Sequence, residues 1–149
     1  MRAVIQRVRR ASVRVDDMIQ GKITHGIVVL LGIRGSDTIT DLQWLAEKVV
    51  NLRIFEDQQG KMNRSLADID GEMLIISQFT LYGDCRKGRR PGFSSAAPPE
   101  IAEPLYQQFI EEIKNRQVRV ATGIFQATME VELVNDGPVT LLLDSEKQF

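Results

Sequence analysis

The sequence has few of the side chains that most hydrolases use for catalysis. Its 149 residues include one histidine, His25, and one cysteine, Cys85. A single cysteine excludes an intramolecular disulfide, which suits a reducing compartment. With only one histidine and one cysteine, the sequence argues against a zinc site. A Ser-His-Asp or Cys-His site would have to use His25, which we interpret as an ordinary residue at the edge of a buried strand.

Long apolar runs and phosphate-binding glycine motifs are also missing. No apolar segment approaches the length of a membrane span, and charge from Arg2 onward interrupts the N-terminus too early for a signal peptide. There is no P-loop or dinucleotide motif. Lys and Arg number 19 against 20 Asp and Glu, a net charge of −1, which argues against nucleic-acid binding through bulk charge but permits a local basic site. We expect a cytoplasmic, soluble, single-domain protein over 1–149, with no membrane partner.

The apolar pattern predicts strands at both ends of the chain and one between two helices. Residues 2–15 alternate with period two, which is typical of strands with one solvated face. Residues 26–33 form a continuous apolar run, typical of a strand buried on both faces. With turn signals at Asp16-Asp17 and Gln20-Gly21-Lys22, the pattern predicts two strands with one solvated face and then the buried strand, three in all before the first helix. The other predicted strands are residues 72–80, 118–120, 127–134 and 139–143.

Two segments carry apolar residues at helical spacing. Residues 42–50 form the first apolar stripe, and Thr40 with Gln43 fits a capping box at its start. Pro98-Pro99-Glu100 opens a second helix that ends near Asn115. The resulting order is βββ-α-β-α-βββ. It predicts a mixed α/β fold, a mostly antiparallel curled sheet with two helices packed on one face.

The segment Ser77-Gln78-Phe79-Thr80-Leu81-Tyr82 follows the most apolar predicted strand. Polar groups at the end of a rigid strand are well placed for catalysis or binding. Hydrolysis without histidine or metal can use backbone N–H groups for an oxyanion, and a hydroxyl or the substrate itself to direct water. The alternative is a core strand that ends in a turn, with Ser77 and Thr80 hydrogen-bonded locally.

A loop with four cations follows this segment. Its cations are Arg86, Lys87, Arg89 and Arg90. They suit phosphate binding, and the flanking aromatics Tyr82 and Phe93 suit a stacked base, although such a loop is often only solvated. Cys85 in the same loop is a candidate nucleophile, but no base lies near it in the sequence, so we interpret it as an incidental thiol.

Asn135-Asp136-Gly137-Pro138 predicts a tight turn between the last two strands. Proline in such a link requires an exposed or bulged position, and Gly137 permits close approach of the backbone to a ligand. No internal repeat or linker interrupts the chain, and residues 144–149 carry no pattern to which we assign a role.

The segments 77–82 and 135–140 together resemble the two signature motifs of the D-aminoacyl-tRNA deacylases, and the chain is similar to the bacterial D-tyrosyl-tRNA(Tyr) deacylases over its whole length. The similarity includes residues 1–8, 52–55 and 60–63, and the arginine loop up to Phe93. It implies an enzyme that hydrolyses the ester between a D-amino acid, or mischarged glycine, and the terminal adenosine of tRNA. Such an enzyme rejects L-aminoacyl-tRNA, recycles tRNA and needs no metal or organic cofactor.

The resemblance also implies a homodimer with active sites at the subunit interface. Ser77, Gln78, Phe79 and Thr80 would line the pocket, with backbone N–H groups acting on the substrate carbonyl. Gly137 and Pro138 correspond to a Gly-cisPro pair that enters the partner's pocket and leaves no room for an L side chain. The remaining implied residues are Arg7, which would fix that pair, and Phe125 and Met129, around the terminal adenine.

Two mechanisms fit the resemblance, with either Thr80 or the ribose 2′-hydroxyl of the RNA in the leading role. We favour the 2′-hydroxyl, because no base that could activate Thr80 is evident in the sequence. Two other hypotheses stay open, a non-catalytic RNA-binding dimer that uses the basic loop 86–90, and a cysteine hydrolase that uses Cys85. Neither involves DNA, and no DNA partner is expected.

Overall fold

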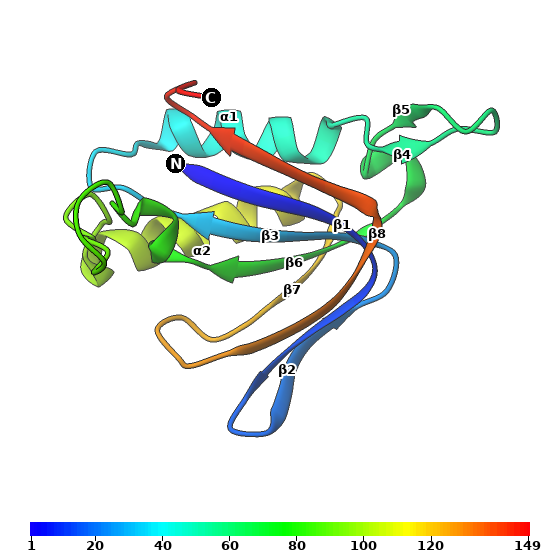
Figure 1. Cartoon of the computed structure of the whole chain (residues 1–149). Coiled ribbons are helices and arrows are strands. Elements are labelled where there is room, and N and C mark those ends of the chain that lie inside the picture. The colour runs from blue at the N-terminus through cyan, green and yellow to red at the C-terminus, as the bar shows by residue number, and fades with distance from the viewer.

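A computed structural model describes residues 1–149 as one curled sheet with two helices and a small separate hairpin (Figure 1). The sheet runs in the order β2-β1-β3-β6-β7, with β8 paired to the free side of β1. Its strands are β1 (Arg2–Val15), β2 (Met18–Ile23), β3 (Gly26–Gly32), β6 (Glu72–Ser77), β7 (Arg119–Thr122) and β8 (Glu130–Asp144). The other elements are α1 (Ile39–Asn51), α2 (Pro99–Asn115), the hairpin β4 (Phe55–Glu56) and β5 (Met62–Arg64), and the 3₁₀ turns η1 (Ala67–Ile69) and η2 (Phe79–Tyr82).

Strand direction follows from the connections. β1 pairs antiparallel with β2, β3 and β8, whereas β3 with β6 and β6 with β7 are parallel. The two parallel pairs are the ones whose connections include a helix, as crossover connections require. The predicted mixed α/β class, with a mostly antiparallel curled sheet, is confirmed. None of the helices is both long and apolar enough to cross a membrane.

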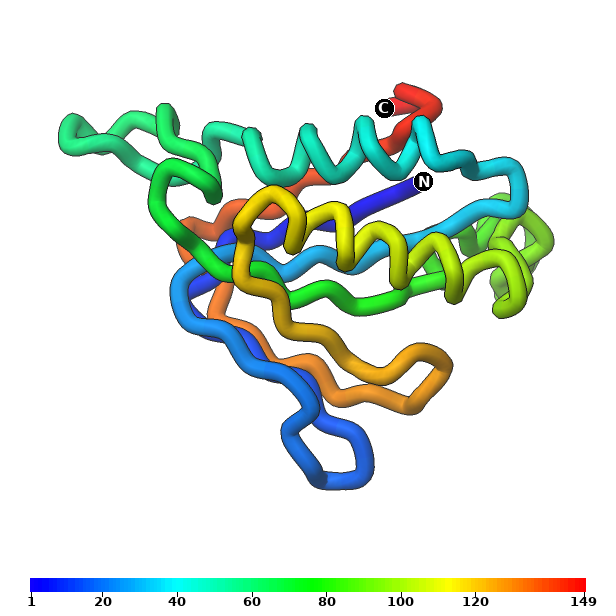
Figure 2. The backbone as a smooth tube through the Cα atoms, turned by 180° about the vertical axis from the view of Figure 1, so that it is seen from behind, coloured from blue at the N-terminus to red at the C-terminus, as the bar shows by residue number.

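Alternate residues of the central strands serve two different cores. In β3, Ile27 and Val29 belong to the larger core together with the buried faces of α1 and α2, whereas Val28 belongs to a smaller core. In β6, Ile75 faces the helices and Leu74 faces the smaller core. Figure 2 shows both helices on the same side of the sheet, as the one-sided stripes predict. The smaller core fills the inside of the curl.

The curl originates in β1. Ile5 packs with the helices and Val8 with the smaller core, which is normal alternation, but Ala11 and Val13 also belong to the smaller core. The alternation therefore shifts after Val8, where the pairing with β8 is irregular. Such bulges bend a strand and increase its twist. The bend brings β2 into contact with β7 and nearly closes the sheet (Figure 1).

The prediction of two strands joined by a tight turn at 135–138 is wrong. These residues lie inside the single strand β8, where its register against β1 is irregular. The side chain of Asn135 spans the bulge, because its Oδ1 accepts from the Val139 N–H (2.8 Å) and its Nδ2 donates to the Val139 carbonyl (3.3 Å). A bulge tolerates proline, which cannot donate to a regular ladder. The last third of the chain thus contributes two strands to the sheet, not three.

Other boundaries also differ from the sequence prediction. The strand predicted over 72–80 ends at Ser77, because the next residues form η2. The capping box is Thr38 with Asp41, not Thr40 with Gln43: the Thr38 hydroxyl accepts from the Asp41 N–H (3.4 Å), and the Asp41 carboxylate accepts from the Thr38 N–H (2.8 Å). Residues 57–70, to which the sequence analysis assigned neither a helix nor a strand, contain β5 and η1.

Candidate active site

The 3₁₀ turn η2 is held against the end of β3. The Gln78 N–H, just before the turn, donates to the Leu31 carbonyl (2.8 Å), and the Gly83 N–H closes the turn on the Thr80 carbonyl (2.9 Å). Close approach depends on Gly32, where a Cβ atom would stand 3.0 Å from Leu81 Cβ. The turn is thus fixed on a rigid strand, although its own residues Phe79 and Thr80 are exposed.

Two free backbone donors and one side-chain hydrogen bond lie on this turn. The N–H groups of Phe79 and Thr80 begin the 3₁₀ turn, so its internal hydrogen bonds cannot use them. The Thr80 hydroxyl accepts from Gln78 Nε2 at 2.5 Å. The amide of Gln78 is not a base, and the ring of His25 packs instead against Phe55 in the hairpin region (5.3 Å between centroids). The turn can therefore stabilise an oxyanion, but no neighbouring base activates Thr80.

A cavity of about 640 Å³ opens beside the turn, and apolar side chains supply most of its wall. The predicted site residues Ser77, Gln78, Phe79, Phe125 and Met129 all line it, whereas Thr80 is adjacent in the turn but outside the lining. The size lies within the usual range for small-ligand pockets, about 300–1,000 Å³. Phe93, which the sequence analysis named as suited to base stacking, also lines the cavity. The remaining lining residues, which the sequence prediction missed, are Ile33, Ile76, Ala96, Ala97, Pro98, Pro99, Ala102, Gln126, Ala127 and Val131.

Aromatic contacts fix two walls of this cavity. Phe93, at the end of the basic loop, packs edge-on against Phe79 with 5.0 Å between ring centroids. Phe125 lies 5.7 Å from the ring of Tyr106 on α2. Burial raises the pKa of Tyr106 to about 12, and its hydroxyl donates to the Ile75 carbonyl (2.9 Å). A protonated tyrosine thereby anchors the wall that carries Phe125.

Gly137, Pro138 and Arg7 form a second cluster, on the bulge between β1 and β8. The Gly137–Pro138 bond is cis, as the resemblance implies. The buried Arg7 guanidinium donates to the carbonyls of Asp136 (2.9 Å) and Ile54 (2.6 Å), so it holds the residue that precedes Gly137.

The two clusters do not meet within one chain. None of these three residues lines the cavity. In the sheet, β1 and β3 separate β8 from β6, a span of three strand spacings or about 14 Å.

The basic loop is exposed throughout. Arg86 forms two hydrogen bonds with the Asp84 carboxylate (2.8 and 2.7 Å), which hold the pKa of Asp84 far below its usual range. Lys87, Arg89 and Arg90 form no ion pair with a carboxylate of the chain. Cys85 is exposed and outside the cavity, so no structural feature favours it as a nucleophile. The loop thus presents three free cations next to the wall that carries Phe93.

Comparison with known proteins identifies the family. The family model for D-Tyr-tRNA(Tyr) deacylase matches residues 4–144. D-aminoacyl-tRNA deacylases of Desulfotalea psychrophila and Thermosipho africanus are 64% and 61% identical over 149 residues, with both chains of each pair covered completely.

Two solved structures share the fold. One, named c-Myc DNA Unwinding Element Binding Protein, is 44% identical, with a TM-score of 0.91 over 97% of this chain and 98% of that chain. The other, described as a probable eukaryotic D-amino acid tRNA deacylase, is 20% identical, with a TM-score of 0.82 over 95% and 97% of the two chains. From the family match and the relatives of full length, the chain belongs to the D-Tyr-tRNA(Tyr) deacylase family.

Proposed function

We propose that this chain hydrolyses the ester bond between a D-amino acid, or glycine, and the terminal adenosine of tRNA, and leaves L-aminoacyl-tRNA intact. Membership of a D-aminoacyl-tRNA deacylase family supports the reaction class. One structural observation carries the proposal: residues 77–79 line a cavity of about 640 Å³ beside a turn with free N–H groups. Aminoacylated tRNA is a cytoplasmic substrate, so the proposal includes a cytoplasmic location for this protein.

In the proposed mechanism, the substrate carbonyl oxygen accepts from the N–H groups of Phe79 and Thr80. Water adds to the carbonyl carbon, the oxyanion forms at these donors, and the ester C–O bond then breaks. The products are the free D-amino acid and tRNA with its terminal hydroxyl restored. The Thr80 hydroxyl is hydrogen-bonded to the Gln78 amide, which is not a base. We therefore assign the role of orienting the attacking water to the ribose 2′-hydroxyl of the substrate.

The apolar cavity suits the terminal adenosine. Phe125 and Met129 supply an aromatic ring and a polarisable thioether, both of which favour contact with a base. The free cations Lys87, Arg89 and Arg90 suit the phosphates that precede the terminal nucleoside. Base and backbone would then be bound by neighbouring parts of one surface.

Chiral selection in this proposal belongs to a second copy of the chain. Gly137 and Pro138 lie about 14 Å from β6, so a site that contains both motifs requires a partner. The outer edge of β8 is unpaired and exposes Leu142, as expected of a strand that lies near an interface. Carbonyl groups of Gly137 and Pro138 would hold the amino group at Cα. Because these backbone atoms contact the substrate at Cα, they distinguish the D from the L enantiomer and still tolerate many different side chains.

The function is tested with D- and L-aminoacyl-tRNA that carry the same amino acid on the same tRNA, in the presence of a chelator. Turnover of the D-ester alone is expected. If a properly folded dimer turns over neither ester but still binds tRNA, the RNA-binding alternative with loop 86–90 replaces the proposal. Equal turnover of both esters would refute the proposal that Gly137 and Pro138 select the D enantiomer.

The shared site is tested by mixing two damaged subunits. Gly137→Val alters the selecting motif, and Ala127→Trp fills the cavity, so neither homodimer should be active. In a mixed dimer one site combines an intact cavity with an intact Gly137–Pro138 pair. Random pairing should therefore restore about a quarter of the full activity. A mixture with no activity, from subunits shown to exchange, would place both motifs in one subunit's site.

A further inference from the structure

A row of three residues crosses the sheet under the turn η2. Arg2 of β1 pairs with Gly32 of β3 on one side and with Asp144 of β8 on the other. Directly paired residues of antiparallel strands point to the same face. At Gly32 that face is occupied by the turn, because a Cβ there would stand 3.0 Å from Leu81 Cβ and 3.4 Å from Tyr82 Cδ2. The side chain of Arg2 therefore begins next to the turn.

Arg2 contacts the turn in two ways. Its Nη1 donates to the Leu81 carbonyl at 3.2 Å. Its guanidinium carbon lies 4.7 Å from the centroid of the buried Tyr82 ring, a cation–π contact. These residues directly follow Phe79 and Thr80, whose N–H groups the proposed mechanism uses. The position of those donors thus depends on where Arg2 holds the second half of the turn.

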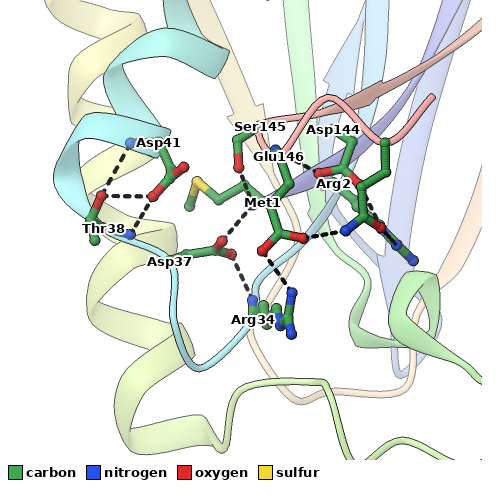
Figure 3. A network of polar contacts seen from close by, with 10 residues as sticks. Met1, Arg2, Arg34, Asp37, Thr38, Asp41, Asp144, Ser145 and Glu146 are labelled. Carbon is green, nitrogen blue, oxygen red and sulfur yellow. Dashed lines mark hydrogen bonds and ion pairs between the residues drawn. The ribbon is translucent and has the colours of Figure 1, made fainter.

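Arg2 is itself held by the end of the chain, as Figure 3 shows. Asp144 Oδ2 accepts from Arg2 Nε (3.2 Å), and Asp144 Oδ1 accepts from the Glu146 N–H (2.9 Å). The Asp144 side chain is 1% exposed, so it makes a nearly buried partner for the cation. The ring of Phe149 lies 5.6 Å from the same guanidinium.

The segment that carries Asp144 is fixed in turn. The Ser145 N–H donates to the Met1 carbonyl (2.9 Å), and the Met1 α-amino group donates to Ser145 Oγ (2.6 Å) and Asp37 Oδ1 (2.5 Å). Asp37 Oδ2 accepts from the Arg34 N–H (2.7 Å), just before α1. A continuous chain of contacts therefore runs from the loop before α1 through residues 144–149 to Arg2.

We propose that Arg2 is a positioning residue for the oxyanion donors on η2, and that Asp144 and the segment 144–149 act through it. The proposal rests on the proposed function only in the use it assigns to the Phe79 and Thr80 N–H groups. Lysine cannot replace Arg2, because an ammonium lacks the planar fork that binds the Leu81 carbonyl and Asp144 together while covering Tyr82. Residues 144–149, which carry no recognisable sequence pattern, thereby become part of the pocket's support.

The test uses Arg2→Lys and Asp144→Asn in the full-length chain. Arg14→Lys is the matched control, because Arg14 is an exposed arginine on the same strand with no ion pair. Two properties are measured: the ¹H–¹⁵N resonances of Phe79 and Thr80, and kcat and KM for D-aminoacyl-tRNA. Thermal unfolding and sedimentation verify that each variant is folded and associates as the unsubstituted chain does.

Displaced N–H donors stabilise the oxyanion less but leave binding of the adenosine largely unchanged. In Arg2→Lys, kcat should therefore fall about tenfold, with KM changed less than about twofold. Asp144→Asn should move the same two resonances and lower kcat less, and Arg14→Lys should change nothing. Unmoved Phe79 and Thr80 resonances in a folded Arg2→Lys variant would overturn the proposal. So would a rise in KM at constant kcat. If the unsubstituted chain is inactive, the proposed function fails, and the resonances alone decide the positioning role.

Discussion

Gly137→Ala is the substitution whose effect follows most directly from the structure. Gly137 has φ +140°, a backbone conformation that is essentially restricted to glycine. An added Cβ would stand 2.8 Å from both Val139 N and Val139 Cγ2, and 3.2 Å from Arg7 Nη2. The Val139 methyl group can turn away, but the backbone nitrogen cannot. The substitution therefore combines conformational strain with a steric clash against the main chain.

The two effects can be separated with other glycines of the same chain. Gly60 has φ +75° with no atom within 4 Å of the position that a Cβ would take, and Gly35 has neither a positive φ nor a near neighbour. Gly35→Ala should change the free energy of unfolding by less than about 1 kcal/mol, in the stabilising direction. Gly60→Ala should destabilise by about 1 kcal/mol through strain alone. Gly137→Ala should destabilise by about 2–4 kcal/mol, because the clash adds to a larger strain.

Urea denaturation of the three variants measures these free energies, with the m-value as a check that the unfolding transition is unchanged. Deacylation of D-aminoacyl-tRNA is measured in parallel. We expect Gly137→Ala to lower kcat/KM, since its Cβ also displaces the guanidinium of Arg7 from the Asp136 carbonyl. A Gly137→Ala variant no less stable than Gly60→Ala would refute the reasoning about the bulge.

Three further predictions concern the site and its surroundings. Thr80→Val removes the hydroxyl but keeps the N–H, so kcat should fall by no more than about tenfold, and a loss of about a thousandfold would identify Thr80 as the nucleophile. The Thr24 N–H and hydroxyl lower the pKa of Glu72 below its ordinary 4.5, so Glu72 stabilises the fold above that pH and loses this effect as pH falls through its lowered folded-state pKa. Glu72→Gln should therefore lower the free energy of unfolding at neutral pH and flatten its decline as the pH falls below about 4.5 in acid titrations. Replacing Lys87, Arg89 and Arg90 by serine should weaken tRNA binding and reduce the slope of log affinity against log salt by about 0.7 for each phosphate that the loop no longer neutralises, whereas an unchanged slope would show that the loop does not bind phosphate.

The periodic parts of the fold could be predicted from the sequence because each apolar pattern matches a single geometry. The stripe at 42–50 and the run at 26–33 became α1 and β3. Where the prediction failed, a side chain or a tertiary contact decided the outcome. The bulge at 135–138 is stabilised by the Asn135 amide and by Arg7. The family resemblance implied the role of Arg7, but residue order gave no sign that the Asn135 side chain spans a bulge.

Part of the candidate site could likewise be predicted from the sequence, and part could not. Ser77, Gln78 and Phe79 could be selected from the sequence, because they follow an apolar strand and match a family motif. The opposite wall could not, since Ile33 follows β3, Pro98 and Ala102 lie at the start of α2, and Val131 lies in the last strand. These residues are ordinary core types at separate places in the chain. Only the curl of the sheet brings them to one cavity.

The pairing of β1 with β8 has a consequence for the synthesis of the protein. β1 leaves the ribosome before the other strands of the sheet, and β8 leaves after all of them. Until residue 144 has been made, one side of β1 has unpaired backbone groups along most of its length, although β2 and β3 can already pair with the other side. An unpaired strand edge of this length invites pairing with other nascent chains. Arg2, Arg9, Arg10 and Arg14 give this edge four positive charges, and their mutual repulsion disfavours such pairing before β8 arrives.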